Sequence, residues 1–255
     1  GEQWRFEDLL NGALIKSGND AACAIAENIG GTEACFTALM RLKAASLGAF
    51  SGYFTNSNGL PSEEQNVSAY DIALFARYGL ANDPFAEIVR SKESKMEYDG
   101  KTKLLQNTNK LLWQDENIIG IKTGTTNAAG PCLVSAMEKD GRLLIAVVLN
   151  SPDRYGESMA LLNYGMEEMA CVDFVKRGEI CAYVPVAGAE GQYLPLVAAN
   201  DGCFLYPQGK QLYIRRFLPR VVASDTPAGS GLGRLIIEDQ DGQIYGWVDL
   251  TLKDF

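Results

Sequence analysis

The sequence contains no histidine, and that absence excludes several kinds of chemistry. Without an imidazole the chain has no histidine general base and no histidine-ligated zinc site. Its longest purely apolar run, residues 143–149, is far shorter than the ~20 residues that a membrane-spanning helix needs. The net charge of −9 comes without any block of Lys and Arg, which argues against binding to nucleic acid. An anionic ligand would therefore have to be met by a few local groups.

The cysteines also lack a pattern, because the six of them include no C-x-x-C pair. Most lie among apolar neighbours at positions that suggest strands or helices. This placement favours buried free thiols over disulfides. No metal or organic cofactor is expected. The cysteines are Cys23, Cys35, Cys132, Cys171, Cys181 and Cys203.

Apolar residues at helical spacing predict a helix-rich first part of the chain. Thr32 and Ser68 are suitable N-caps for two of these helices, because their hydroxyl groups can accept hydrogen bonds from the first turn. Residues 51–66 are rich in Ser, Asn, Gly and Pro and predict a surface loop. The helices are expected at residues 6–15, 20–29, 33–47, 69–78 and 158–170.

Three β-prone runs, residues 118–123, 132–137 and 142–150, predict an antiparallel meander with turns between them. Alternating stretches at residues 92–98 and 101–105 come before it. After about residue 172 the sequence pattern changes to short β-prone runs separated by Gly, Asp and Pro. This pattern predicts a small all-β sandwich. These runs are residues 180–186, 193–198, 211–217, 235–238 and 245–248. We expect one domain over residues 1–171 and a β-rich domain over residues 172–255.

Two short polar motifs lie about a hundred residues apart. Ser17-Gly18-Asn19 falls in the tight connection between two predicted helices, and Lys122-Thr123-Gly124 ends the strand that begins the meander. Each motif alone is weak, since Ser, Gly and Asn are ordinary turn residues and Lys-Thr-Gly is common. Their structural context, a helix connection and a strand end, makes the pair informative.

The two motifs fit the needs of acyl transfer at a peptide carbonyl. That reaction needs an activated nucleophile, an oxyanion site and groups that hold the anionic end of the substrate. Lys122 and Thr123 can bind a carboxylate, and Gly124 lets a substrate backbone approach the strand. Ser17 can relay a proton while Asn19 bonds the substrate amide. In the absence of histidine, an unprotonated lysine is the expected base.

Four stretches together resemble the D-alanyl-D-alanine carboxypeptidases, which are low-molecular-mass penicillin-binding proteins of the serine peptidase type. The resemblance covers essentially residues 1–170, and the β-rich tail is more weakly similar to the smaller domain that follows in this family. It implies an α+β fold, with a β-lactamase/transpeptidase-like domain of helices and antiparallel sheet followed by an all-β sandwich. The stretches are FEDLLNGALIKSGNDAACAIAENIGG (6–31), FTNSNGLP (54–61), NTNKLLW (107–113) and GIKTGTTNAAGPCLVSA (120–136).

The resemblance also implies roles for individual residues. Ser17, Asn19 and Lys122 would be catalytic, while Thr123, Gly124 and Thr125 would bind substrate. Arg154 would be a further carboxylate partner, although it could equally be a surface residue after the turn at residues 151–153. Asp20 is expected to be a helix N-terminal charge and not a catalytic acid. The implied ligands are peptidoglycan stem peptides and β-lactam antibiotics, without nucleic acid.

Two departures from the family pattern stand out. No Ser-x-x-Lys, which supplies the nucleophilic serine and its lysine, occurs in these 255 residues. Asn66 stands where similar proteins often carry a histidine, a change that should be tolerable next to a helix start. If the Ser-x-x-Lys segment is absent from the molecule, the remainder is expected to be inert, whether through truncation or through degeneration.

Three functions therefore stay open at the level of the sequence. The first is serine-type carboxypeptidase activity in the complete protein, removing terminal D-alanine through an acyl-enzyme outside the cytoplasmic membrane. Attachment to the membrane surface would then depend on a segment not present here. The second is a non-catalytic homologue that binds peptidoglycan or a partner. The third is a serine β-lactamase, although residues 62–66 do not give the Glu-x-x-x-Asn spacing of its deacylating glutamate.

Overall fold

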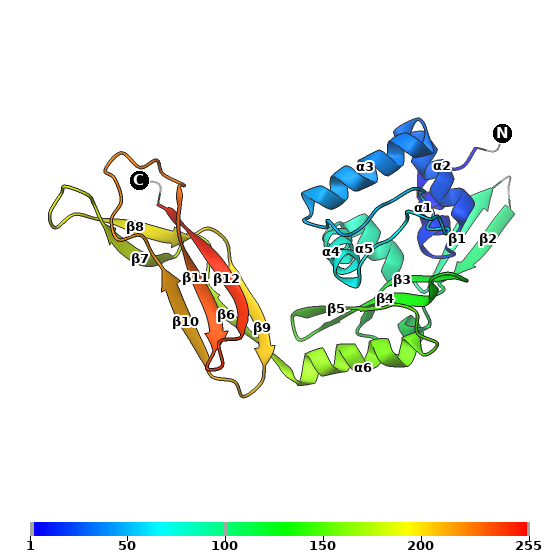
Figure 1. Ribbon diagram of the computed structural model, residues 1–255. Helices are drawn as coiled ribbons and strands as arrows, with labels where there is room; N and C mark the ends of the chain where they lie inside the picture. Colours follow the sequence, from blue (N-terminus) through cyan, green and yellow to red (C-terminus); the bar gives the residue numbers. More distant parts are fainter. Residues whose placement is uncertain (1–2, 99–100, 254–255) are drawn as a thin grey trace. The chain divides into compact units, whose positions relative to one another are not determined.

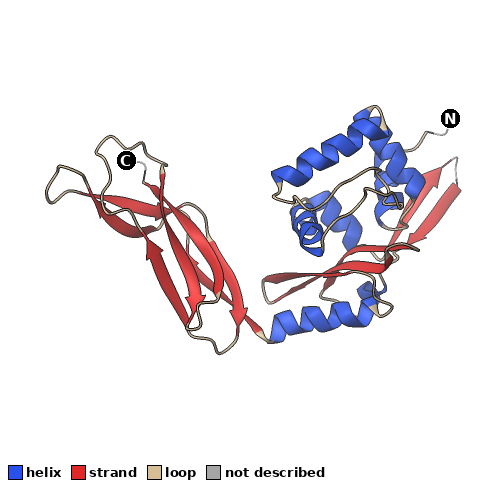
Figure 2. Cartoon of the chain, in the orientation of Figure 1, coloured by secondary structure: helices blue, strands red, loops and turns tan. Residues whose placement is uncertain are grey.

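The computed structural model describes residues 3–98 and 101–253, and the chain divides into two compact units (Figure 1). The first unit covers Gly1–Gly165 and the second Met166–Phe255. The boundary expected after residue 171 falls inside strand β6 (Met169–Val175). Figure 2 shows that the first unit mixes helices with strands, whereas the second is built of strands. No helix within the described ranges has both the length and the apolar character needed to cross a membrane.

Two helices of the first unit begin at the N-caps that the sequence predicts. The Thr32 side chain accepts a hydrogen bond from the Cys35 N–H at the start of α3, and Ser68 does the same for the Asp71 N–H at the start of α4. These contacts confirm both predicted N-caps and stabilise each helix by about 1 kcal/mol. The helices are α1 (Phe6–Leu14), α2 (Asn19–Gly30), α3 (Glu33–Ser46), α4 (Ala69–Leu80), α5 (Asp83–Arg90) and α6 (Arg154–Glu167).

The predicted meander forms a sheet in the order β3-β4-β5 and is antiparallel throughout. Its strands are β3 (Ile118–Thr126), β4 (Gly130–Lys139) and β5 (Arg142–Val148). A separate hairpin is formed by β1 (Glu93–Tyr98) and β2 (Lys101–Gln106), and the short 3-10 helix η1 (Lys110–Trp113) follows it. Among the described residues, β3 pairs only with β4.

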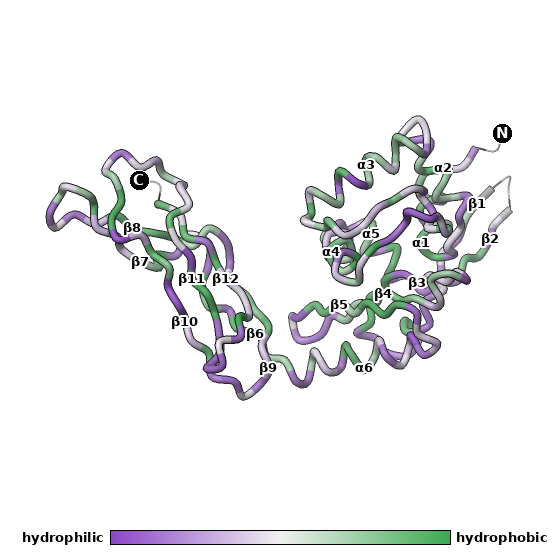
Figure 3. The backbone as a smooth tube through the Cα atoms, in the orientation of Figure 1, coloured by the Kyte–Doolittle hydropathy of each residue, from purple (hydrophilic) through white to green (hydrophobic). Residues whose placement is uncertain are grey.

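The sheet is covered on both faces. Helix α5 packs on β3 and α4 packs on β5. A buried cluster of Ala76, Val89, Ile119, Ile121 and Ala136 fills that interface. Helix α6 runs along the opposite face (Figure 1), where a Cβ at its Gly165 would lie 2.5 Å from a methyl group of Leu144 in β5. Burying these strands on both faces explains their near-continuous apolar sequence (Figure 3).

The second unit contains two antiparallel sheets. One has the order β10-β11-β12-β8-β7 and the other pairs β6 with β9. Val175 in β6, Ala198 in β8 and Val248 in β12 are buried together, with Phe204 from β9 packed against them. A Cβ at Gly246 in β12 would collide with the Phe204 ring, so glycine is needed for this approach. The remaining strands are β7 (Ile180–Pro185), β8 (Tyr193–Ala198), β9 (Gly202–Pro207), β10 (Leu212–Phe217), β11 (Gly231–Asp239) and β12 (Ile244–Leu252).

Several elements differ from the expectations. Helix α5 was not predicted, although Asn82 caps it and Pro84 stands in its first turn. Strands β6 and β9 were missed, and η1 was missed as well. The last helix of the first unit was predicted to begin four residues late. Its predicted end was also too late, so that Met169 and Ala170 were assigned to a helix instead of to β6. The fold class itself is confirmed.

The expectation of buried cysteines is wrong. All six carry free thiols, and none is buried: Cys35, Cys171 and Cys203 are exposed and the other three are partly exposed. The apolar neighbours in sequence misled the prediction, because alternate residues of a strand point to opposite faces. Cys171 and Cys203 lie on the two strands of the small β6–β9 sheet, on a face that is open to solvent.

Candidate functional site

The connection between α1 and α2 presents Ser17 in an unusual conformation. The Gly18 N–H donates to the Gly12 carbonyl oxygen at 2.9 Å, which closes the turn after α1. Ser17 has a φ of +64°, a left-handed conformation that costs a non-glycine residue about 1 kcal/mol. Its side chain is exposed. The first motif is therefore held in a strained turn with its hydroxyl group available.

Lys122 brings the two motifs together. The residue belongs to β3, and its Nζ donates to the Ser17 Oγ at 2.8 Å and to the Thr123 carbonyl oxygen at 2.7 Å. Burial, and secondarily the nearby positive charge of Arg154, lower the pKa of Lys122 to about 8. No ion pair within the described part of the chain involves this lysine. Lys122 is thus a partly buried cation without a carboxylate partner.

Arg154 and Thr125 form a second polar group beside Lys122. The Arg154 Nη1 donates to the Gly124 carbonyl oxygen and to the Thr125 Oγ1, both at 2.9 Å, and to the Cys132 carbonyl oxygen at 3.1 Å. Arg154 is the first residue of α6 and is not a detached surface residue. The space over Gly124 is open, because a Cβ built there would have no atom within 4 Å. Two cationic side chains therefore flank an accessible stretch of β3.

Thr123 has a different environment from the one that the sequence suggested. It is only 8% exposed, and its Oγ1 lies 2.6 Å from the Thr108 Oγ1. This short hydrogen bond occupies the hydroxyl that was expected to meet a substrate carboxylate. Thr125, two residues further along the strand, is exposed instead. Thr125 is therefore the more exposed of the two threonines, and its hydroxyl donates to the Gly124 carbonyl oxygen at 2.7 Å.

Thr108 is the main contact that motif reasoning missed. It belongs to the Asn107-Thr108-Asn109 segment, where both asparagines are buried and their side chains form hydrogen bonds with backbone groups. The Asn107 Nδ2 donates to the Ser91 carbonyl oxygen at 2.9 Å, and the Asn109 Oδ1 accepts from the Leu111 N–H at 3.2 Å. These bonds fix the segment so that Thr108 faces Thr123.

The signal for Thr108 was present in the stretch NTNKLLW, which carried part of the family resemblance. Buried asparagines in a loop are expensive unless they bond the backbone, so a pair of them flanking a threonine indicates a positioned side chain. Tyr155, also missed, completes the contact: its hydroxyl donates to the Thr108 carbonyl oxygen at 3.2 Å.

Asn19 and Asp20 lie at the start of α2, two and three residues after Ser17. Asn19 is the first residue of the helix and is exposed. The Asp20 Oδ1 accepts a hydrogen bond from the Ala21 N–H at 2.9 Å, as befits an acidic residue in a first helical turn. Asn19 is therefore an exposed residue two positions after Ser17, and the Asp20 carboxylate bonds within its own helix.

Comparisons with known proteins identify the family of the chain. The family model of the D-alanyl-D-alanine carboxypeptidases matches residues 1–153. The D-alanyl-D-alanine carboxypeptidase DacF of Bacillus subtilis is 28% identical over 261 residues, which cover 100% of this chain and 67% of the relative. DacD of Escherichia coli is 28% identical over 260 residues, covering 99% of this chain and 66% of the relative. The chain thus spans about two thirds of the length of these relatives.

Among solved structures, penicillin binding protein 5 of Haemophilus influenzae is similar with a TM-score of 0.84 and 27% identity, covering 97% of this chain and 73% of that one. The helices and the antiparallel sheet therefore define the transpeptidase-like fold of the penicillin-binding proteins. Because the family model matches more than half of its residues, the chain belongs to the D-alanyl-D-alanine carboxypeptidase family.

Proposed function

We propose that the complete protein is a serine-type D-alanyl-D-alanine carboxypeptidase that removes the terminal D-alanine from peptidoglycan stem peptides in the cell envelope. In this proposal the present chain supplies the substrate-binding and proton-transfer groups. The nucleophilic serine and its lysine belong to a Ser-x-x-Lys segment, and without that segment the chain performs no chemistry.

The observation that carries the proposal is the 2.8 Å hydrogen bond between the Lys122 Nζ and the Ser17 Oγ. It joins two motifs that are 105 residues apart in the sequence. Ser17 adopts a strained backbone conformation at this contact, and strained residues are concentrated at functional sites. A surface turn with no role would more readily carry glycine at a position with positive φ.

The exposed part of β3 suits the terminal D-alanine. A substrate backbone can lie beside Gly124, where no side chain of the described protein intervenes. Its carboxylate would be held by the ammonium group of Lys122, the Thr125 hydroxyl and the Arg154 guanidinium group. Asn19, exposed at the start of α2, would bond the amide of the preceding residue.

Catalysis would then proceed in two steps. The nucleophilic serine attacks the carbonyl carbon of the penultimate residue, and the bond to the terminal D-alanine nitrogen breaks. Ser17 relays a proton to that nitrogen through its hydroxyl group, whose position the Lys122 Nζ fixes. A water molecule next attacks the ester carbonyl, so that the shortened peptide leaves and the serine is regenerated.

Intact mass spectrometry with and without a β-lactam tests this proposal. The 255-residue chain alone should form no covalent adduct. The protein extended with a Ser-x-x-Lys segment should gain the mass of one β-lactam. An adduct on the chain as given would mean that another serine acts as nucleophile. Rapid release of hydrolysed β-lactam by the extended protein would favour a β-lactamase instead.

A non-catalytic binding role is the second candidate, and one observation favours it. Lys122, Thr125 and Arg154 are assembled within this chain, without any contribution from a Ser-x-x-Lys segment. In that case the chain should bind an N-acetylated D-alanyl-D-alanine peptide, and the extended protein should bind it without turnover. Release of free D-alanine by the extended protein would exclude this alternative.

A further inference from the structure

The small β6–β9 sheet places three ligand-bearing side chains on one solvent-exposed face. Asp173 in β6 lies opposite Cys203 in β9, and Cys171 lies opposite Leu205. Since alternate residues of a strand share a face, Cys171, Asp173 and Cys203 project to the same side. All three are exposed. The two thiols are therefore diagonal neighbours on adjacent strands and are accessible to reagents in solution.

The distance between the two sulfur atoms distinguishes a disulfide from a metal site at this cluster. The Cys171 Sγ and the Cys203 Sγ lie 2.8 Å apart. Two thiolates bound to one tetrahedral zinc ion lie about 3.8 Å apart, because each Zn–S bond is about 2.3 Å long. A carboxylate oxygen of Asp173 is also near, since the ligand atoms of the three residues all lie within 4.8 Å of one another. The sulfur atoms are nevertheless closer than metal ligation requires.

We propose that Cys171 and Cys203 form an intrachain disulfide that links β6 to β9. The side chains already meet across the strand pair, so that bond formation needs little backbone movement. An oxidising compartment, as expected for an envelope protein, would allow the bond to persist. The inference does not depend on catalysis, because the second unit carries none of the residues of the candidate site.

Oxidation can occur by exchange with a small disulfide such as oxidised glutathione. The Cys171 thiolate attacks the oxidant, forming a mixed disulfide and releasing one small thiol. The Cys203 sulfur then attacks the Cys171 sulfur, which forms the intrachain bond and releases the second small thiol. The two protein thiols lose two electrons and two protons in total, and the oxidant gains them.

The order of attack follows from the thiols' surroundings. Sharing a hydrogen bond with Cys171, together with burial and the Asp173 carboxylate, raises the pKa of Cys203 to about 12. Cys203 therefore holds its proton more tightly than an ordinary cysteine does, which makes it a weaker first nucleophile. Once Cys171 is in the mixed disulfide, that hydrogen bond is lost and Cys203 can react.

Thiol counting in the full chain tests the proposal. The protein is equilibrated with oxidised glutathione, denatured and alkylated with iodoacetamide, and its intact mass is measured by mass spectrometry. Of the six cysteines, four should be alkylated before reduction and six after it. Peptide mapping should find the fragments of Cys171 and Cys203 joined. Six alkylated thiols before reduction, or a bond between other cysteines, would overturn the proposal.

Variants provide matched controls. In Cys203→Ser no intrachain linkage should form, and Cys171 should remain in the mixed disulfide with glutathione, whereas Cys181→Ser, which removes another thiol of the same unit, should keep the linkage. Reduction should lower the Tm of the second unit by about 10 °C in the unsubstituted protein and in Cys181→Ser, but not in Cys203→Ser. Zinc binding by the protein together with resistance to oxidation would instead assign the cluster to a metal. A linkage found only between two chains would also contradict the proposal.

Discussion

Two lysines, one in each unit, have opposite electrostatic surroundings. Lys122 in the first unit lies between a hydroxyl group and a carbonyl oxygen, and burial lowers its pKa to about 8. Lys210 in the second unit lies 2.8 Å from the Asp241 Oδ2 and 3.2 Å from the Asp239 Oδ2. Hydrogen bonds to Asp241 and Asp239 raise the pKa of Lys210 well above its ordinary value. One cation is left without a counter-ion by the fold, and the other is neutralised by it.

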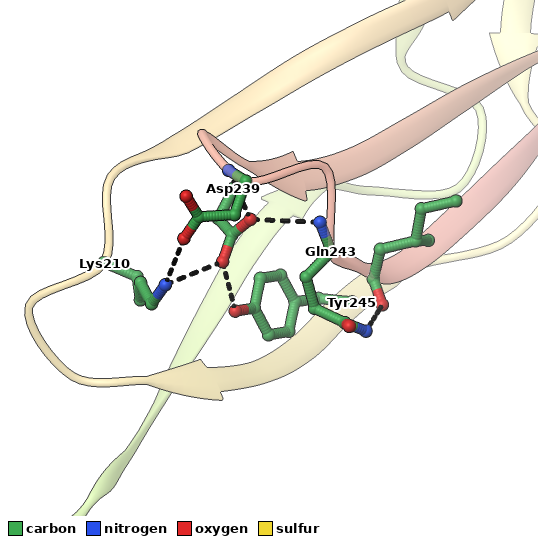
Figure 4. Close-up of polar contacts among 6 residues, drawn as sticks. Lys210, Asp239, Gln243 and Tyr245 are labelled. Atoms are coloured by element: carbon green, nitrogen blue, oxygen red, sulfur yellow. Dashed lines mark hydrogen bonds and ion pairs between the residues drawn. The ribbon is translucent and has the colours of Figure 1, made fainter.

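Figure 4 shows the polar contacts that surround Lys210 and Asp239. The Asp239 side chain is 1% exposed, and it accepts hydrogen bonds from the Tyr245 hydroxyl at 2.8 Å and from the Gln243 N–H at 3.0 Å. Burial alone would raise the pKa of Asp239, but these bonds and Lys210 lower it to about 2. The cluster closes the turn between β11 and β12.

The comparison separates a structural use of charge from a use in binding. A buried carboxylate with a cation and several donors stabilises a turn and leaves nothing for a ligand. A half-buried cation with no carboxylate is costly for the fold, and the cost is recovered when an anion binds. Of the two lysines, only Lys122 has the surroundings of a ligand-binding residue.

The largest expected effect is that of Lys122→Ala. In the protein extended with its Ser-x-x-Lys segment, this change should lower the rate of β-lactam acylation by at least about 100-fold, because it removes the charge that orients the carboxylate. The second-order rate constant from a fluorescent penicillin is the appropriate measurement. Unchanged acylation would rule out the role assigned to Lys122.

Lys210→Ala is the matched control for that substitution. It should leave the acylation rate unchanged while lowering the Tm of the second unit, because Asp239 would lose its buried cation. Differential scanning calorimetry resolves this effect if the two units unfold separately. A large loss of acylation in Lys210→Ala would contradict the purely structural role assigned to Lys210.

The pH dependence of ligand binding is the next effect in size. Because the pKa of Lys122 is about 8, its ammonium group is charged at neutral pH and loses its proton above pH 8. The affinity of this chain for N-acetyl-D-alanyl-D-alanine should therefore fall above pH 8, approaching tenfold per pH unit. Calorimetric titration between pH 6 and about pH 10 measures it. Lys122→Met should bind weakly at every pH.

Acid should act on the second unit through Asp239. Its pKa is lower in the folded protein than in the unfolded chain, so its contribution to stability is present above about pH 4. That contribution should be lost as the pH falls from about 4 to about 2. Asp239→Asn should flatten this part of the curve of Tm against pH. A wild-type curve with the same slope as the variant would contradict the assignment.

The smallest effect concerns the strained turn. Ser17→Gly should stabilise the first unit by up to about 1 kcal/mol relative to Ser17→Ala, because glycine adopts a φ of +64° without strain. Both variants lack the hydroxyl group and should slow acylation equally in the extended protein. Urea unfolding of the two variants measures the difference. A less stable Ser17→Gly would mean that the turn stores no strain.

Sequence reasoning succeeded where one local pattern determines the structure. The N-caps at Thr32 and Ser68 and the meander could all be predicted from short-range patterns. It failed where the signal is weak or competes with another. Helix α5 has only eight residues, and Met169 was assigned to the end of an apolar helix instead of to a strand.

The contacts within the site show a further limit. That Lys122 contacts Ser17 depends on how β3 is placed against the α1–α2 connection, which no short pattern encodes. Thr123 is buried and its hydroxyl contacts Thr108, which lies outside β3 in the segment after β2. The family resemblance suggests the candidate residues, and only the fold assigns their hydrogen-bond partners.

The most direct test of this account is the pKa of Lys122, measured by NMR titration of its side chain in the folded protein. The account predicts a value of about 8, with an upward shift when N-acetyl-D-alanyl-D-alanine is added, because a bound carboxylate stabilises the ammonium group. A value at or above the ordinary 10.5 of a lysine would show that Lys122 is already neutralised within the fold. That result would remove the distinction from Lys210 on which the proposed function depends.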